Sequence, residues 1–162
     1  MAPPAPVWQR LIFGLILAWW THAALAIQPV PVAENLAVDS PTARDGKVPI
    51  VVLFSRAHCG WCDKARREHL DAMATHSAGG ALFRRIDVDS DARLIDFSGQ
   101  STSHRTFARK HGAKMTPTLM FFGPDGQALA DPIVGYRLPE FYGMLIEDAI
   151  EDSRNRLRSK DK

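Results

Sequence analysis

Two cysteines separated by two residues constrain this chain more than any other feature. Cys59 and Cys62 are its only cysteines, so a larger disulfide framework is not possible. The segment before them, 48–54, is a continuous apolar run rich in β-branched residues, which is typical of a strand buried on both faces. After the pair, inward-facing positions recur every three or four residues as far as Met73, which indicates a helix. The pair therefore lies where a buried strand leads into a helix.

The start of a helix is a position that favours the reactive, ionised form of a cysteine. The first turn of a helix has unpaired N–H groups and a partial positive charge, and both stabilise a thiolate. We expect the pKa of the Cys59 thiol to lie below the value of about 8.5 for free cysteine, so that Cys59 attacks a substrate disulfide. Cys62, one turn deeper, would then resolve the mixed disulfide. Two other interpretations stay open: a static structural disulfide, and a metal site completed by His58 or His69.

Hydrophobic runs and turn residues predict a mixed sheet. The predicted strands are 48–54, 81–88, 118–122 and 127–135. A Gly-Pro-Asp-Gly turn at 123–126 makes the last two strands antiparallel, whereas the first two flank a crossover helix and run parallel. The element order is β-α-β-α-β-β-α. It predicts an α/β fold with a central mixed sheet and helices on both faces.

The predicted helices have recognisable ends. The first follows Cys62 and stops at Gly79, the second spans 104–111 behind a Ser103 cap, and the last begins at Pro139. The polar segment 89–103 is predicted to be a loop or an insertion. The predicted buried side of the last helix comprises Phe141, Tyr142, Leu145, Ile146, Ala149 and Ile150.

A proline before a buried strand is the second candidate site feature. X-Pro bonds are where cis peptides occur, and a cis bond between Thr116 and Pro117 would expose the backbone of Thr116 to an extended substrate. A plain strand-initiating proline is the other interpretation, and the spacing of about 60 residues from the cysteines favours cis. Trp61, between the cysteines, is expected to be partly exposed, where it contacts clients or covers the edge of the site.

The first 26 residues have the layout of a secretory signal peptide. Arg10 precedes an apolar run at 11–20, and the small-residue site Ala-Leu-Ala at 24–26 predicts cleavage after Ala26. An uncleaved membrane anchor is the other possibility. Export to a bacterial periplasm, or to a eukaryotic secretory compartment, would place the cysteines where disulfides persist.

Charge and composition limit the possible roles of the remaining segments. The net charge is +2, from 20 Lys and Arg against 18 Asp and Glu, and no basic stripe indicates nucleic-acid binding. The Pro-rich segment 27–47 is expected to be a linker or an N-terminal arm. The last residues, 153–162, are expected to be a charged, solvated tail.

These features resemble the thioredoxin superfamily. The matching segments are the strand end at 51–54, the pair with its Gly60-Trp61 spacer, Thr116-Pro117-Thr118, the strand and turn at 121–126, and Gly135. The resemblance implies a thioredoxin-like domain over 48–152, redox roles for Cys59 and Cys62, and a substrate-binding cis-proline role for Pro117, with no cofactor or resident metal. Within the superfamily, the chain is similar to the exported group that includes SoxW thioredoxins and the catalytic domains of DsbC-type proteins.

Two departures from the family pattern have consequences. Leu53 stands where cytoplasmic thioredoxins keep a buried aspartate as proton acceptor, so water or Glu68 would have to assist Cys62. The segment 27–47 is too short to be the separate dimerisation domain of DsbC-type isomerases, so we expect a monomer.

The leading hypothesis is a periplasmic thiol–disulfide oxidoreductase that reduces disulfides of client proteins and is kept reduced by a membrane electron donor. The same residues would also serve an oxidase or an isomerase, because the direction depends on the reduction potential. A thioredoxin-fold metallochaperone for copper or zinc is the second hypothesis. A client-binding chaperone with idle cysteines is the third.

Overall fold

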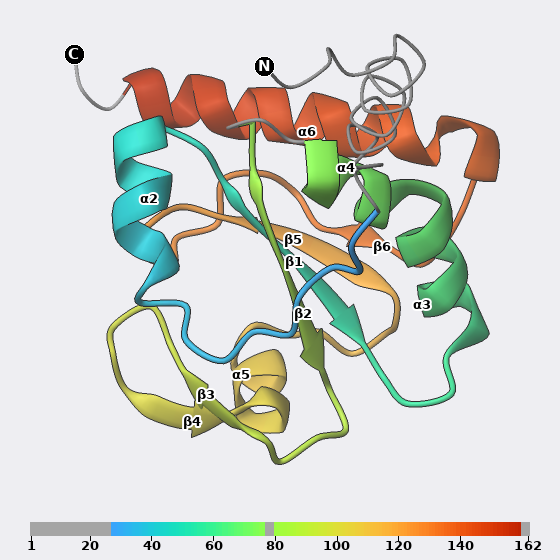
Figure 1. Ribbon diagram of the computed structural model, residues 1–162, viewed down its shortest axis with the longest axis horizontal. Helices are drawn as coiled ribbons and strands as arrows, with labels where there is room; N and C mark the ends of the chain where they lie inside the picture. The colour runs from blue at the N-terminus through green and yellow to red at the C-terminus, as the bar shows by residue number, and fades with distance from the viewer. Residues whose placement is uncertain (1–26, 77–79, 160–162) are drawn as a thin grey trace, which may run out of the picture.

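The computed structural model describes residues 27–76 and 80–159, so the predicted signal peptide at 1–26 lies outside it. Within this part, a four-stranded sheet in the order β2-β1-β5-β6 forms the centre (Figure 1). Its strands are β1 (Ile50–Ser55), β2 (Leu82–Asp87), β5 (Thr118–Phe122) and β6 (Ile133–Val134). β1 runs parallel to β2 and antiparallel to β5, which is in turn antiparallel to β6. The predicted α/β fold with a mixed sheet is confirmed.

β1 is buried along its whole length because elements cover both faces of the sheet. Successive side chains of a strand point to opposite faces. Val51 and Leu53 therefore join one buried apolar cluster, whereas Ile50, Val52 and Phe54 join the other. Burial on both sides explains why the sequence of this strand is continuously apolar and does not alternate.

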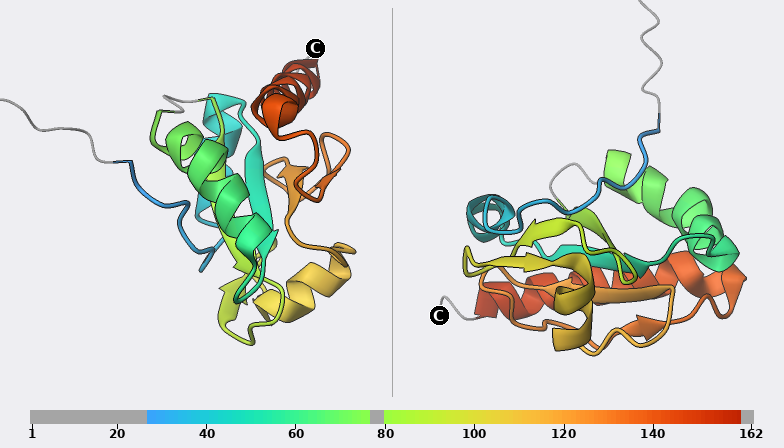
Figure 2. Two further views of the ribbon diagram at one scale, coloured as in Figure 1. Left: turned by 90° about the vertical axis from the view of Figure 1, so that its right-hand side faces the viewer. Right: turned by 90° about the horizontal axis from the view of Figure 1, so that it is seen from below.

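Helices cover the sheet on both sides, as the two side views show (Figure 2). They are α2 (Asp39–Gly46), α3 (Gly60–Ala65), the π-helical turn η2 (Arg66–Leu70), α4 (Asp71–His76), α5 (His104–Lys110) and α6 (Pro139–Ser159). The segment from α3 through α4 and the helix α6 pack on the first cluster, while α2 and α5 pack on the second. The helix predicted after Cys62 is therefore present, but it contains a π turn that the sequence pattern did not predict.

The segment 27–47 is bonded to the rest of the domain. The N–H of Val30 donates to the carboxylate of Asp71 (2.9 Å), and the N–H of Ala33 donates to the carbonyl of Arg85 on β2 (2.8 Å). It also contains α2, a helix that the sequence analysis did not predict. Pro41 is tolerated there because it lies in the first turn, where its missing N–H has no helical partner.

The segment 89–103, predicted to be a loop or an insertion, contains a two-stranded hairpin, so the plain-loop alternative is wrong. Its strands are β3 (Arg93–Ile95) and β4 (Ser101–Ser103). Asp96 organises the turn between them, because its carboxylate accepts the N–H groups of Ser98 (2.9 Å) and Gln100 (3.0 Å). The strands carry few β-branched or aromatic residues, so the hairpin depends on this side-chain turn and not on strand propensity.

The last strand is shorter than predicted. Only Ile133–Val134 forms β6, and Ala128 adds an isolated bridge to Phe122. Pro132 lacks a backbone N–H, so it cannot continue the ladder back toward the turn. The predicted antiparallel return over 127–135 is therefore present only at its two ends.

The predicted buried face of α6 is partly wrong. Phe141 and Leu145 are 52% and 38% exposed, whereas Tyr142, Ile146 and Ser153 are buried. The buried positions are four and seven residues apart, and residues with these spacings lie on one narrow side of a helix. The first turns of α6 therefore present large apolar side chains to solvent.

α6 also continues through most of 153–162, the segment predicted to be a solvated tail. Within residues 27–76 and 80–159, no helix is both long enough and apolar enough to cross a membrane.

Candidate functional site

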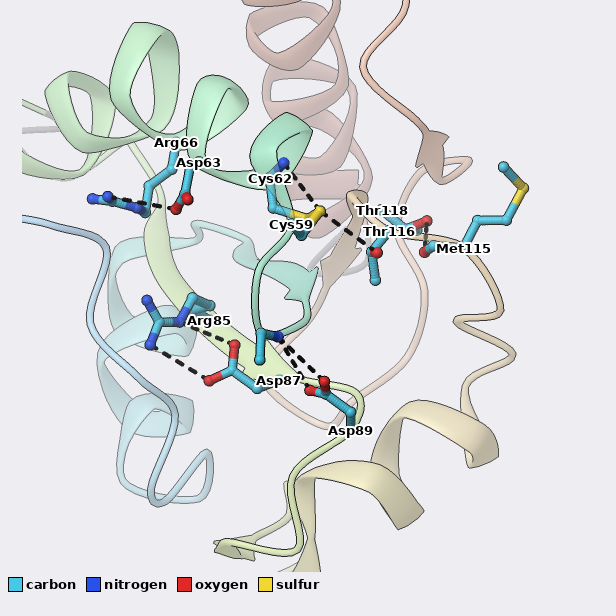
Figure 3. The surroundings of a disulfide bond; sticks show 11 residues. Cys59, Cys62, Asp63, Arg66, Arg85, Asp87, Asp89, Met115, Thr116 and Thr118 are labelled. Carbon is cyan, nitrogen blue, oxygen red and sulfur yellow. Dashed lines mark hydrogen bonds and ion pairs between the residues drawn. A yellow bond between two sulfur atoms is a disulfide. The ribbon is translucent and has the colours of Figure 1, made fainter.

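β1 and α3 place the two cysteines. Cys59 is the N-cap of α3, with an extended backbone (φ −96°, ψ 94°). Its Sγ accepts the N–H of Cys62 at 3.2 Å, which satisfies one of the free N–H groups at the helix start. The two residues form a disulfide, with their Cα atoms 5.2 Å apart (Figure 3). Cys62 is buried and Cys59 is partly exposed, so Cys59 is the sulfur that a partner reaches first.

The loop before β5 lies beside Cys59. The peptide bond between Thr116 and Pro117 is cis. The hydroxyl of Thr116 lies 3.7 Å from Sγ of Cys59, and it is the donor because a disulfide sulfur carries no hydrogen (Figure 3). The carbonyl of Pro117 accepts the N–H of Gly135 (2.8 Å), which ties this loop to the end of β6. The structure thus brings the two sequence motifs, 57 residues apart, to one place.

Trp61 projects from the start of α3. Its side chain is 61% exposed, and one ring face stacks on Tyr136 with ring centroids 6.1 Å apart. The ammonium of Lys64 lies 5.8 Å from the centroid of each of these two rings. Trp61 is therefore exposed but held, as an apolar surface next to the disulfide.

Tyr136 links α3 and η2 to the loop that precedes α6. Its hydroxyl donates to the carboxylate of Glu68 (2.5 Å), and Nε2 of His69 lies 3.1 Å from the same oxygen. Desolvation, together with the hydrogen bond and charge of Glu68, raises the pKa of Tyr136 to about 12. Tyr136 could not be identified from the sequence, because nothing in the local pattern brings residue 136 to residues 68 and 69. The only signal was its place directly after Gly135.

Leu53 is fully buried behind the cysteine pair and carries no titratable group. It pairs with Arg85 on β2 and with Leu119 on β5. Glu68, the acid that the sequence analysis named as a possible substitute, is engaged by Tyr136 and lies 3.9 Å from Lys64. Neither of these contacts is with Cys62.

A polar cavity of about 480 Å³ opens on the other side of Cys59. Arg85 and Asp87 form an ion pair in its wall, with Nε of Arg85 3.3 Å from the carboxylate (Figure 3). Asp89 accepts the N–H of Ala57 at 3.3 Å and so holds the loop between β1 and α3. Charged groups of both signs therefore line one approach to Cys59, and the aromatic pair lines another.

The two histidines considered for a metal site take different places. His69 contacts Tyr136, as described, and Tyr142 (ring centroids 5.4 Å apart). His58 lies in the loop before Cys59 with a left-handed backbone (φ 56°). In the part of the chain that the structure covers, no three His, Cys, Asp or Glu residues are grouped so that they could hold a metal ion.

Comparisons with known proteins place this site in a family. The sequence matches the thioredoxin-like domain family over residues 36–150. No curated protein matches the sequence at a significant level.

Solved thioredoxins have a similar fold. Mitochondrial thioredoxin 3 of Saccharomyces cerevisiae in its oxidized form is 20% identical, with a TM-score of 0.51 over 76% of this chain and 94% of that one. Fasciola hepatica thioredoxin is 20% identical, with a TM-score of 0.52 over 75% and 96%. Thioredoxin F of spinach chloroplast is 19% identical, with a TM-score of 0.52 over 80% and 97%. The chain therefore belongs to the thioredoxin-like domain family and, with its Cys59–Cys62 pair, is a thiol–disulfide oxidoreductase.

Proposed function

We propose that this protein is an exported oxidoreductase that reduces disulfide bonds of client proteins. The observation that carries the proposal is the placement of Cys59. Its sulfur caps α3, is partly exposed and lies 3.7 Å from the hydroxyl of Thr116, whereas its partner Cys62 is buried. An accessible sulfur with a protected partner is the arrangement that disulfide exchange requires.

The reaction transfers two electrons and two protons to the client. In the reduced protein, the Cys59 thiolate attacks one sulfur of the client disulfide, and the other client sulfur leaves as a thiolate that takes up a proton. Cys62 loses its proton and attacks Sγ of Cys59. The Cys59–Cys62 bond forms, the mixed disulfide breaks, and the second client sulfur leaves as a thiolate that takes up the second proton from solvent. Because Leu53 offers no carboxylate, we propose that solvent accepts the proton of Cys62.

Thr116, Pro117 and Trp61 bind the client in this proposal. No backbone hydrogen bond of Thr116 is found within residues 27–76 and 80–159, so its N–H and C=O are available to an extended client segment. Such pairing gives affinity without demanding a particular client sequence. The exposed ring of Trp61, between the two cysteines in the chain, adds apolar contact.

The cellular setting is a further part of the proposal. The signal-peptide layout of residues 1–26 supports export to the periplasm, with a membrane donor that returns electrons to the pair. Trp61 before Cys62 and Thr116 before Pro117 support the resemblance to DsbC-type catalytic domains, and the polar segment 96–100 supports the resemblance to SoxW thioredoxins. The segment 27–47 packs on its own domain, which supports a monomer.

The reduction potential of the Cys59–Cys62 pair, measured against glutathione, tests this function. A value near −270 mV, as in thioredoxin, supports a reductase, and a value near −120 mV, as in DsbA, supports an oxidase. Insulin reduction by the same sample checks that the pair turns over. Anaerobic purification with stoichiometric copper or zinc and no insulin reduction would instead support a metallochaperone.

A further inference from the structure

We propose that the exposed side of the first turns of α6 is a docking site for client segments that are both apolar and basic. This inference rests on the proposed function and adds a client class to it. The site, called here the apolar stripe, comprises Leu138, Phe141, Met144 and Leu145. These side chains are 63%, 52%, 51% and 38% exposed.

The stripe is a continuous surface on one side of α6. Residues three and four apart on a helix are neighbours, so Phe141, Met144 and Leu145 lie together, and Leu138 precedes them at the helix start. The opposite side of the helix is buried through Tyr142 and Ile146. Single exposed apolar residues are common on protein surfaces, but a contiguous group of large ones marks a place that another molecule covers.

Acidic residues dominate the charge along the stripe, although the exposed Arg137 directly precedes Leu138 and Glu151 is paired with Arg154 (3.5 Å) and Arg158 (3.7 Å). Between residues 138 and 153 the sequence has five acids and no Lys or Arg. The acids are Glu140, Glu147, Asp148, Glu151 and Asp152, and all five are exposed. Like charges disfavour a second copy docked through the same face, and they repel an anionic lipid surface. A partner with apolar side chains flanked by Lys or Arg complements both the apolar stripe and the acidic residues beside it.

The first turn of α6, which carries part of the stripe, is held next to α3. Tyr136 stacks on Trp61 and also contacts Tyr142, with ring centroids 4.7 Å apart, so aromatic rings run from the start of α3 to the first turn of α6. The first turns of α6 and the helix α3 lie at the same end of the molecule in Figure 1 and in the right view of Figure 2. Tyr142 lies on the buried side of these turns, opposite the stripe, so the ring contacts hold the start of α6 beside α3. A client whose disulfide lies at Cys59 would extend past Trp61 and around the first turns of α6 to reach the stripe.

Two disulfide-bonded model peptides of equal length test the proposal. One carries Leu, Phe and Lys beside the disulfide, and the other carries Ser and Glu at the same positions. The fully reduced protein is mixed with a limiting amount of each peptide, and the thiols are trapped by alkylation over time. Each event converts the Cys59 and Cys62 thiols to a disulfide and the peptide disulfide to two thiols, so no other reductant is needed. We expect the apolar, basic peptide to react about tenfold faster.

The triple variant Phe141→Ala/Met144→Ala/Leu145→Ala should abolish this preference, and Glu147→Gln/Asp148→Asn should reduce it in a salt-dependent way. All of these side chains are exposed and lie outside the redox machinery, and alanine favours the helix. The matched control is Val38→Ala, which removes a 65% exposed apolar side chain next to α2 and should leave the preference unchanged.

Hydroxyethyl disulfide, too small to reach the stripe, separates the two proposals. It should react equally with the wild type and the triple variant, whereas a wild type that reduces no disulfide contradicts the proposed function. Binding of a cysteine-free version of the apolar, basic peptide tests docking without chemistry and should weaken about tenfold in the triple variant. Equal rates and affinities for both peptides would overturn the docking site. So would a wild-type dimer that the triple variant converts to a monomer, because the stripe would then be covered by a second copy.

Discussion

The starts of α3 and α5 share one geometry and differ in chemistry. At each, the first residue outside the helix has an extended backbone, and its side chain accepts the N–H three residues later at 3.2 Å. The acceptor is Sγ of Cys59 in α3 and Oγ of Ser103 in α5. Each is also within hydrogen-bond distance of a threonine hydroxyl, Thr116 at 3.7 Å and Thr106 at 3.1 Å.

This comparison shows how a structural cap becomes a reactive group. A hydroxyl at the N-cap accepts hydrogen bonds as a neutral group, and it stays neutral at physiological pH. A thiol in the same position ionises within reach of that pH, and the helix N–H groups and the partial positive charge stabilise the charged form. The helix start is capped by a neutral group at Ser103, and in the proposed function it promotes a reaction at Cys59.

The largest effect on activity is expected when the cysteine cap of α3 is replaced by serine, the cap residue of α5. In Cys59→Ser the hydroxyl can still accept the N–H of Cys62, so we expect the far-ultraviolet circular dichroism spectrum to be retained. The rate of insulin reduction should fall by roughly a thousandfold or more, because a serine hydroxyl is a poor nucleophile. In Cys62→Ser, by contrast, Cys59 should form a mixed disulfide with the client and retain it. Insulin reduction by Cys59→Ser at a rate near that of the wild type would contradict the assigned roles.

Removing the cap of α5 should affect stability alone. Ser103→Ala leaves an N–H at the helix start without its acceptor, so we expect the free energy of unfolding in urea to fall by about 1 kcal/mol. The rate of insulin reduction of the folded protein should not change. Ser103→Thr retains an acceptor and should lie close to the wild type, so equal losses in both variants would refute the capping role.

α3 is additionally tied to the rest of the fold through Tyr136, and this contact should show in alkaline solution. Tyr136→Phe keeps the stacking on Trp61 but removes the hydrogen bond to Glu68, which should lower the free energy of unfolding at pH 7 by about 1 kcal/mol. The pKa of Tyr136 is raised from 10.0 to about 12 in the fold. The protonated form is therefore favoured by folding, and its stabilising effect is complete below pH 10 and is lost as the pH rises toward 12.

Urea titrations of the wild type and Tyr136→Phe across this range check the prediction. Tyr142 is present in both proteins, and burial, the larger cause of its raised pKa, is common to both; the smaller cause, the charge of ionised Tyr136, is lost in Tyr136→Phe. The difference in stability should shrink between pH 10 and 12. A constant difference in stability between pH 10 and 12 would contradict the prediction, because it would show that the pKa of Tyr136 is the same in the folded and the unfolded protein.

The threonine beside each cap should produce the smallest effects. The hydroxyl of Thr116 can donate to the Cys59 thiolate more strongly than to a disulfide sulfur, so it stabilises the reduced protein. Thr116→Val should therefore make the reduction potential more negative, by about 20 mV. Thr106→Val, the matched change beside Ser103, should leave the potential unchanged. A shift to a less negative potential in Thr116→Val would contradict the direction of this hydrogen bond.

Elements with strong local signals could be predicted from the sequence. The β-branched run over 48–54 marks β1, and the turn at 123–126 follows β5. Ser103 does cap α5, and Gly112, with φ 73°, follows its end. These features depend on nearest neighbours in the chain, which a single sequence contains.

The missed features depend on contacts between distant segments. The π turn brings Glu68 and His69 to Tyr136, 68 and 67 residues away. Phe141 and Tyr142 are adjacent aromatic residues, yet only Tyr142 is buried, because the angle of α6 on the sheet decides which side is covered. Periodicity locates an apolar side on a helix but does not fix its centre when the apolar arc is wide.

The most direct test of the central claim is a pH titration of the Cys59 thiol in the reduced protein, followed through the rate of its alkylation. Stabilisation by the start of α3 predicts a pKa clearly below about 8.5, within the range of about 3.5 to 7.5 known for thiols in such positions. A Cys59 thiol that titrates near 8.5, like an unperturbed cysteine, would contradict the claim that the helix start activates it.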